Sequence, residues 1–368
     1  MIKIVDIIRV LEAWAPPVLQ ESYDNVGLLT GNRSDRCTGV LCCLDVTEAV
    51  LDEALQKGCN LVVAHHPLIF RGIKKLSGET GVEKSLIKAI KSDLAIYSIH
   101  TNLDNVLSGV NGKIAALLQL RNSRVLLPRE NVLKKLVTYV PIQHTDPVRQ
   151  ALFDAGAGQI GNYSECSFSV GGEGTFKAGQ AARPFVGSSG LRHQEKENRL
   201  EVLYPAYLER SLLEALRNSH PYEEVAYDLV PLDNGHQALG AGLIGELTEP
   251  VEEAVFLSQL ARTFRAGQVR HSPLLGKPIR RVALCGGAGS FLISNALSAG
   301  ADIFITADLK YHDFFMADGR MVLADIGHFE SEQFTIELLA DHLAEKFHNF
   351  AVLKTSINTN PVNYLWHK

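Results

Sequence analysis

The sequence has no long apolar run and no long basic block. No apolar run approaches the roughly 20 residues that a membrane-spanning helix requires, and the mean hydropathy is +0.03. Asp and Glu outnumber Lys and Arg, 41 to 36, which gives a formal net charge of −5 at pH 7. Because nucleic-acid binding depends on concentrated positive charge, we expect neither a membrane nor a nucleic acid among the partners of this protein.

The six cysteines form no CxxC pair, which argues against a zinc–thiolate site. Four of them lie in or beside apolar segments, as buried and reduced thiols do in a cytoplasmic protein. We therefore expect a cytoplasmic location and, for a metal site, ligands from histidine and carboxylate. The six positions are Cys37, Cys42, Cys43, Cys59, Cys166 and Cys285.

The N-terminal segment MIKIVDIIRVLEAWAPP resembles a signal peptide only superficially. Asp6 and Glu12 interrupt its apolar pattern, and no small-residue cleavage site follows. Apolar residues recur at helical spacing instead, and Pro16 stops the pattern. We predict an amphipathic core helix whose buried face carries Ile4, Ile7, Ile8 and Leu11.

With 368 residues the chain exceeds one ordinary core and should form two or three domains. From about 38 to 120, and again from about 280 to 350, short apolar runs alternate with helical patterns. Such continuous runs indicate buried parallel strands with helices on their faces. The expected strands are GVLCCLD, NLVVAHH, LAIYSIHT, RRVALCGG, ADIFITAD and MVLADIGH, and a long helix is expected from about 331 to 346.

These two stretches look like an internal repeat. A shift of 242 positions sets NLVVAHH against DIFITAD, so that His66 matches Asp308. A shift of 228 sets SIHTNLD against DIGHFESE, so that His100 matches His328 and Asp104 matches Glu332. The change of shift corresponds to a difference in loop length.

The stretch between the two halves has another pattern. An alternating strand from LPRENVLKKLVTYVPI is followed by a helix, two strands around a Gly-rich loop, a second helix and the strand EEVAYDLVPL. The order β-α-β-β-α-β is ferredoxin-like. We predict an α/β protein with a duplicated α/β domain of buried, mostly parallel or mixed sheets. Residues 1–126 and 239–368 form its halves, and 127–238 form an inserted ferredoxin-like α+β domain.

Histidines and carboxylates follow three of the expected strands. His65 and His66 follow LVVA, Asp104 lies beyond SIH, and His328 and Glu332 lie beyond LADI. Ligands of open α/β sheets gather at the carboxyl ends of strands. Each element also has a simpler explanation as a helix cap or turn, but all three occur at the same kind of position.

This set suits two divalent cations. Asp104 and His65 would serve one ion, His66 and His328 the second, and Glu332 would bridge them. Histidine with carboxylate suits Zn, Mn or Fe(II), with Zn expected in purified material. Two such ions activate a water or hydroxide between them and stabilise charge on the attacked group.

Further residues are candidates for the same cleft. Asp24 and Asn25, in YDNVGL, would position substrate or a histidine, or else form an Asx turn before a strand at Gly27. Asp308, at the end of the strand ADIFITAD, is a further candidate for substrate binding, and His312 lies four residues beyond it. The Gly-rich stretch 286–290 can cradle phosphate but lacks a Walker or dinucleotide spacing, and a tight turn is the preferred interpretation.

Five motifs of the two flanking halves are distinctive together: YDNVGL, AHHPLIF, SIHTNLD, TADLKYHDF and GHFESEQF. Through them the sequence resembles the GTP cyclohydrolase I type 2 family, also described as Nif-three-like dinuclear metal proteins. It implies the same five metal ligands, a PII/CutA-like insert of the long bacterial form, and a toroidal homohexamer. It also implies opening of the guanine imidazole ring with loss of formate, for which His100 or His312 would transfer protons.

Three functions follow as hypotheses. The first is a dinuclear metal-dependent hydrolase that acts on a small molecule. Its specific form is the GTP cyclohydrolase type, in which a metal-bound hydroxide attacks a purine nucleotide. The second is a non-catalytic, metal-binding regulator or scaffold. The third is a metallophosphatase that acts on nucleotides.

Overall fold

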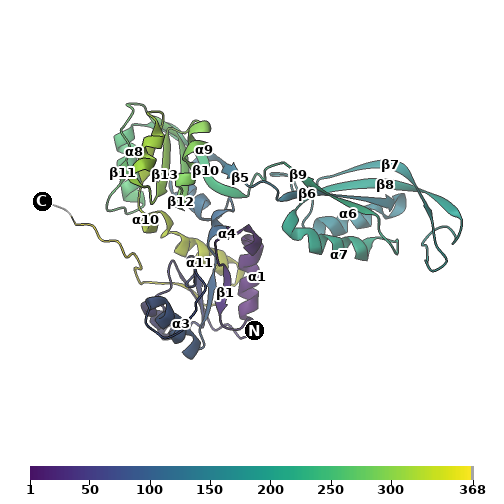
Figure 1. Ribbon diagram of the computed structural model, residues 1–368, viewed down its shortest axis with the longest axis horizontal. Coiled ribbons are helices and arrows are strands. Elements are labelled where there is room, and N and C mark those ends of the chain that lie inside the picture. Colours follow the sequence, from purple (N-terminus) through teal and green to yellow (C-terminus); the bar gives the residue numbers. More distant parts are fainter. Residues whose placement is uncertain (366–368) are drawn as a thin grey trace. The chain divides into compact units, whose positions relative to one another are not determined.

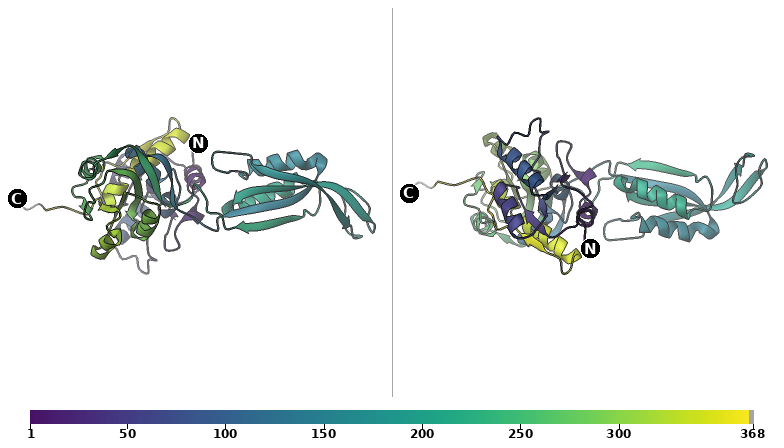
Figure 2. Two further views of the ribbon diagram at one scale, coloured as in Figure 1. Left: turned by 90° about the horizontal axis from the view of Figure 1, so that it is seen from above. Right: turned by 90° about the horizontal axis from the view of Figure 1, so that it is seen from below.

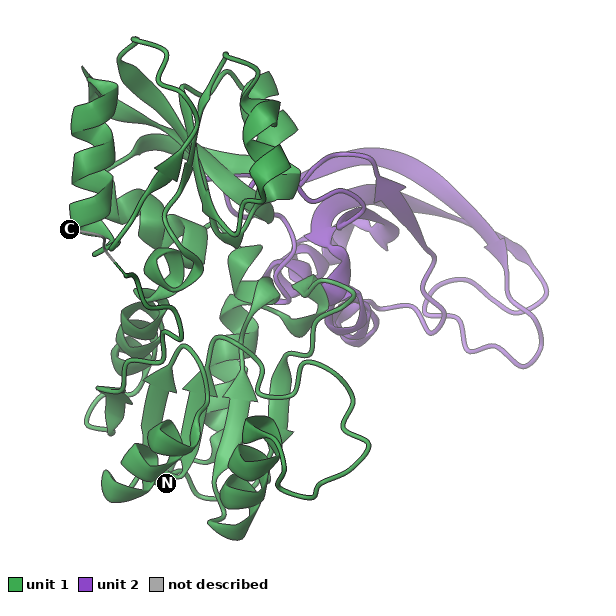
Figure 3. Ribbon diagram, turned by 60° about the vertical axis from the view of Figure 1, so that its left-hand side comes forward, with its two compact units in different colours: residues 1–127, 238–368 green, residues 128–237 purple. Residues whose placement is uncertain are grey.

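The computed structural model describes residues 1–365. The chain divides into two compact units, Met1–Leu127 with Ala238–Lys368, and Pro128–Gln237 (Figure 3). The first unit therefore contains both halves of the chain, and the second is the segment between them. Within residues 1–365 no helix has both the length and the apolarity to span a bilayer.

The first unit contains a five-stranded sheet with the order β1-β4-β3-β2-β15. β2, β3, β4 and β15 run parallel, and β1 pairs antiparallel with β4. The strands expected around 40, 61 and 95 are confirmed, and every residue of these three is buried. The bounds are β1 Gly27–Thr30, β2 Val40–Cys43, β3 Leu61–Ala64, β4 Ala95–Ser98 and β15 Val352–Lys354.

Helices cover this sheet (Figure 1). The predicted N-terminal helix is α1, Ile4–Trp14, and its buried residues are the four predicted ones. The Thr47 hydroxyl accepts a hydrogen bond from the amide of Val50 and so caps α2. The other helices of this half are α2 Glu48–Gln56, α3 Gly81–Lys91, α4 Thr101–Asp104 and α5 Val110–Leu117.

A six-stranded sheet with the order β11-β14-β13-β12-β10-β5 forms the rest of the first unit. The strands expected at RRVALCGG, ADIFITAD and MVLADIGH are confirmed as β12, β13 and β14, whereas β10 and the helix α8 were not anticipated. The bounds are β5 Arg121–Pro128, β10 Gly240–Val251, α8 Glu253–Thr263, β11 Arg270–His271, β12 Ile279–Ala288, α9 Ile293–Ser298, β13 Ile303–Ala307, the 3-10 helix η5 Tyr311–Ala317 and β14 Val322–Asp325.

The two sheets repeat one register. Val40 pairs with Leu61 in the first sheet, and Val282 pairs with Ile303 in the second, at the 242-position shift. In the neighbouring pair of strands Ser98 corresponds to Asp325, a shift of 227 rather than 228. The second half has one extra residue between Asp325 and His328, so His100 and His328 again match at a shift of 228. Gly327, with φ +93°, stands at this position, and that backbone conformation favours glycine.

The prediction of one long helix from about 331 to 346 is wrong in where the helix begins and in treating it as unbroken. It is two helices, α10 His328–Glu332 and α11 Thr335–Lys346. The side chains at the break contact another element. Gln333 donates to the carbonyl of Phe264, 2.8 Å away, and the ring of Phe334 packs edge-on against that of Phe264. Tertiary contacts therefore override the helical pattern, and α10 becomes a separate turn that carries His328 and Glu332.

The second unit has the element order β-α-β-β-α-β and an antiparallel sheet with the order β7-β8-β6-β9. Its two helices lie on one face of this sheet (Figures 1 and 2). The first strand begins at Leu133, later than expected, because Asn131 has φ +58° and interrupts the extended run. The bounds are β6 Leu133–Pro141, α6 Thr145–Asp154, β7 Ser167–Lys177, β8 Arg192–Pro205, α7 Glu209–Ser219 and β9 Tyr227–Leu232.

Candidate metal centre

Three chain segments bring histidines and carboxylates together in the first unit. β3 ends at Ala64 and is followed by His65 and His66, while α4 ends with Asp104. α10 begins with His328 and ends with Glu332. Since β3 belongs to the first sheet and α10 follows β14 of the second, the cluster requires both halves of the chain.

Glu332 stands at the centre of the cluster. Its Oε2 lies 2.9 Å from Nε2 of His66 and 3.0 Å from Nε2 of His328. Its Oε1 lies 3.9 Å from Nε2 of His65, which is itself 3.7 Å from Oδ1 of Asp104. The four-residue spacing of His328 and Glu332 places both side chains on one face of α10. All five residues that the sequence singled out as ligands thus converge.

The other nitrogen of each imidazole is fixed by an oxygen. Nδ1 of His66 contacts Asp45 Oδ1, and Nδ1 of His328 contacts Asp308 Oδ2, both at 2.7 Å. Nδ1 of His65 lies 2.9 Å from the carbonyl of Ile99. Metal-binding histidines typically make such contacts, which fix the tautomer and turn Nε2 toward the ion.

Two buried atoms in the cluster have no hydrogen-bond partner among residues 1–365: Nε2 of His65 and Oδ1 of Asp104. Buried polar atoms are normally paired, so orphaned ones require an explanation. A cation between them would supply the missing interaction. Two groups have ligand atoms within 4.8 Å of one another, His66 with His328 and Glu332, and His65 with His66 and His100. The donor set therefore fits a metal ion.

The charges of the cluster shift its pKa values strongly. Burial lowers the pKa of His65 to about 4. Burial opposes protonation of His66 too, but contacts with Asp45 and Glu332 raise its pKa to about 9. Burial, followed by the charge of Glu332, raises the pKa of Asp104 well above its usual range. Without a cation the site is thus a set of competing charges, which a divalent ion would compensate.

The absence of a side chain at Gly287 leaves space for the side chains of the candidate metal centre. It lies in β12 with φ +61°, and a Cβ built there would lie 2.3 Å from Oε1 of Glu332 and 3.3 Å from Cε1 of His328. Its amide donates to the Ser331 hydroxyl, 2.9 Å away. The tight turn expected over 286–290 is thus in large part strand, because β12 runs to Ala288 and its glycines pack against the cluster.

The other residues predicted for the site make contacts of different kinds. Asp24 binds Nδ1 of His100 at 2.8 Å and the amide of Thr101 at 3.0 Å. Asn25 donates to the carbonyl of Ile69. Asp308 holds His328 from a left-handed backbone conformation, φ +57°. His312 is exposed on η5 and is in neither ligand group; its ring contacts Tyr311 and Phe315.

Sequence reasoning missed Asp45, the partner of His66. Its second oxygen accepts a hydrogen bond from Thr359, 2.7 Å away. Asp45 ends the apolar run GVLCCLD, so its position after a strand was the available signal. A cavity of about 390 Å³ opens beside these residues. Its lining includes Asp45, His66, Arg270, His328 and Tyr364.

Fold and cluster together define an α/β protein with a candidate metal site. Residues 2–361 match the family model Duf34/NIF3 (NGG1p interacting factor 3). The chain belongs to this family.

Related proteins align with this chain over nearly its whole length. A protein of Halalkalibacterium halodurans named GTP cyclohydrolase 1 type 2 homolog is 40% identical, with 98% of each chain covered. A Bacillus subtilis protein of the same name is 35% identical at the same coverage. The crystal structure of a Bacillus cereus protein related to NIF3 superposes with a TM-score of 0.86 and 37% identity, covering 99% of both chains.

Proposed function

We propose that this protein is a dinuclear metal-dependent hydrolase. His65 and Asp104 would hold one ion, His66 and His328 the other, and Glu332 would bridge them. The observation that carries the proposal is the position of Glu332, whose Oε2 faces His66 and His328 while Oε1 faces His65. A bridging carboxylate offsets the mutual repulsion of two cations and leaves coordination positions open.

When bound, two divalent cations would activate a water molecule and stabilise charge on the attacked group. The chain itself orients the ligands. Asp45 and Asp308 fix the rings of His66 and His328 through Nδ1. Asp24 fixes His100 in the same way, and the other ring nitrogen would take up and deliver a proton beside His65 and His66. Because both oxygens of Asp24 are engaged, we assign it positioning rather than substrate binding.

The proposed substrate is a purine nucleotide, with GTP as the first candidate, in keeping with the name that the relatives carry. Protein loaded with Zn, Mn or Fe(II) is incubated with GTP, and formate and phosphate are measured separately. Formate release that is lost in His66→Ala supports a cyclohydrolase. Phosphate release indicates a metallophosphatase instead. Bound metal without turnover on a panel of nucleotides favours the regulator or scaffold.

The role of His100 has its own test. His100→Gln should retain the bound metal and lose turnover, because the side chain moves a proton rather than holding an ion. If the variant loses metal, His100 is a ligand, as its place in the group with His65 and His66 also allows. His312 remains a second proton-transfer candidate on sequence grounds alone, and His312→Gln is the companion variant.

We further propose that residues 128–237 form a ferredoxin-like domain of the PII/CutA kind, that six chains form a ring, and that the protein is cytoplasmic. The element order and the sheet order β7-β8-β6-β9 support the domain. Five buried cysteines without disulfides support a reducing compartment. Light scattering of the purified protein tests the hexamer, which a mass near that of one chain would contradict.

A further inference from the structure

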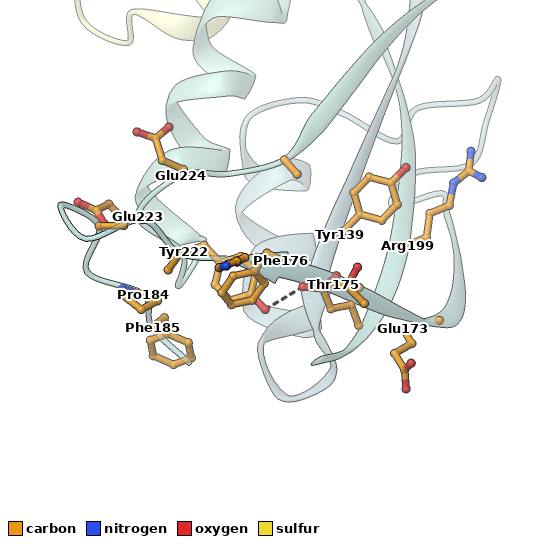
Figure 4. A pocket seen from close by; sticks show the side chains of 18 of the residues that line it. Tyr139, Glu173, Thr175, Phe176, Pro184, Phe185, Arg199, Tyr222, Glu223 and Glu224 are labelled. Carbon is orange, nitrogen blue, oxygen red and sulfur yellow. Dashed lines mark hydrogen bonds between the residues drawn. The ribbon is translucent and has the colours of Figure 1, made fainter. Parts of the chain in front are cut away.

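The inserted unit contains a cavity of about 730 Å³ that has no part in the proposed hydrolase (Figure 4). β7 forms one wall, the loop after it forms a second, and residues between α7 and β9 form a third. All of its lining residues lie within 128–237. A volume of this size accommodates a small organic molecule.

Aromatic rings line one side of the cavity. The ring of Tyr222 lies 6.1 Å from that of Phe176 and 6.3 Å from that of Phe185, centre to centre. Figure 4 shows these three side chains grouped together, with Tyr139 on the other side. Faces of aromatic rings attract cations and pack well against flat apolar groups.

A buried carboxylate with an unused oxygen faces this aromatic group. Glu197 on β8 is only 8% exposed, and Oε1 accepts a hydrogen bond from the Tyr222 hydroxyl, 2.8 Å away. Oε2 takes no part in a hydrogen bond or ion pair within residues 1–365, and it is not among the enclosed side-chain atoms that lack a partner. It therefore reaches the open cavity that Glu197 lines, where an occupant can act as its partner.

One glycine of β7, Gly174, makes room for that carboxylate. A Cβ built on Gly174 would lie 2.2 Å from Oε2 of Glu197 and 2.9 Å from its Cδ. Gly171 and Gly172 also line the cavity. Glycine inside a strand weakens it and often marks the close approach of a ligand or another chain segment. At Gly174, the absence of a side chain thus allows the Glu197 carboxylate to take its position.

The charges around the cavity favour a positively charged occupant. Its lining has four carboxylates, from Glu173, Glu197, Glu223 and Glu224, and two cationic side chains, from Lys177 and Arg199. Arg199 forms an ion pair with Glu201 at 2.9 Å, which reduces its contribution. An anionic ligand would meet net repulsion here.

We propose that this cavity binds an organic cation, a primary ammonium or amidinium group carried on a flat apolar body. The cationic group donates to Oε2 of Glu197, and the apolar body packs against Phe176, Phe185 and Tyr222. This site is independent of the metal centre and of the reaction proposed there.

Titration calorimetry on the full-length protein tests the proposal with three probes of one shape and different charge: phenethylamine, 2-phenylethanol and phenylacetate. Phenethylamine should bind once per chain, and the neutral and anionic probes at least about tenfold more weakly, as expected for the loss of one charge-assisted hydrogen bond. Absence of saturable phenethylamine binding, or equal binding of the three probes, overturns the proposal.

Variants localise the binding. Glu197→Gln should weaken phenethylamine binding by about tenfold or more, and Gly174→Ala should weaken it by displacing Glu197. Glu214→Gln, an exposed carboxylate on α7 outside the cavity, should change it by less than about twofold. If Glu197→Gln does not fold, Phe176→Leu replaces it, with an expected loss of about threefold. Equal effects of the cavity variants and Glu214→Gln would contradict the assignment.

Discussion

Glu332 and His66 are separated by 266 positions, yet Oε2 of the first lies 2.9 Å from Nε2 of the second. His66 follows β3 of the five-stranded sheet, and Glu332 ends α10 after β14 of the six-stranded sheet. One contact thus joins the two repeated halves. The candidate metal centre can form only when both halves are folded against each other.

Glu332→Gln should remove the centre of the cluster. The amide has no negative charge with which to compensate a cation, so metal affinity should fall by more than about tenfold, the lower limit for loss of an outer contact. Competition with a chromophoric chelator measures the affinity. Glu337→Gln changes a half-exposed carboxylate on α11 and serves as the control. Wild-type affinity in Glu332→Gln would contradict the assigned role.

Asp45→Asn should weaken metal binding without removing a ligand. Asp45 fixes the His66 ring and is itself held by Thr359. Losing such a contact typically costs 10–100-fold in metal affinity, so about that range is expected. Thr359→Val should have a smaller effect in the same direction. Asp52→Asn, on the exposed side of α2, is the control. The same chelator competition applies, and equal affinities in Asp45→Asn and Asp52→Asn would argue against this orienting role.

Gly287→Ala and Gly319→Ala separate backbone strain from crowding of the site. Both glycines have positive φ, +61° and +60°, so backbone strain by itself should lower the free energy of unfolding of each variant by roughly 1 kcal/mol. Only at Gly287 would the new Cβ meet Glu332; no atom lies within 4 Å at Gly319. Metal affinity should therefore fall in Gly287→Ala alone. Urea unfolding and chelator competition measure the two effects, and equal metal affinity in both would refute the crowding.

Glu53 should make the free energy of unfolding depend on pH in the acidic range. Burial acts to raise the pKa of Glu53, but hydrogen bonds from Lys57, Ser356 and Thr355 outweigh it and lower the pKa to about 2. Because folding lowers the pKa of this carboxyl from 4.5, its ionised form stabilises the folded state fully at pH values above 4.5. This contribution is lost as the pH falls from 4.5 toward about 2. Glu53→Gln should cost about 1–3 kcal/mol at pH 7.

Urea unfolding of both proteins at pH 7, 5 and 3 measures this difference. The gap between wild type and Glu53→Gln should be similar at pH 7 and 5 and smaller at pH 3. Lys88→Gln, which removes an exposed ion pair with Asp52, should show little change at any pH. A gap that is constant down to pH 3 would contradict the lowered pKa.

Much of the fold was accessible from the sequence because buried parallel strands are continuous apolar runs. β2, β3 and β4, and the matching β12, β13 and β14, were predicted for this reason. β10 and α8 were not anticipated. The break between α10 and α11 depends on contacts of Gln333 and Phe334 with Phe264, which no local pattern encodes.

The convergence of His65, His66 and Glu332 could be anticipated because each follows a strand. The orienting contacts could not. Asp45 reaches His66 because β2 and β3 are neighbours in register, and Thr359 reaches Asp45 because the segment after β15 returns to this edge. Likewise, Asp24 reaches His100 across 76 positions. Such partners depend on the order of strands in the sheet, and several orders fit one sequence pattern.

The metal content of the purified protein tests the central claim most directly. Protein prepared without oxygen, loaded with Zn, Mn or Fe(II) and dialysed to remove loosely held ions is examined by elemental analysis alongside Glu332→Gln. We expect about two ions per chain in the wild type, the number that the proposed two-metal site requires, and far fewer in the variant. Wild-type protein that retains no ion, or a variant that retains as much as the wild type, would contradict the account.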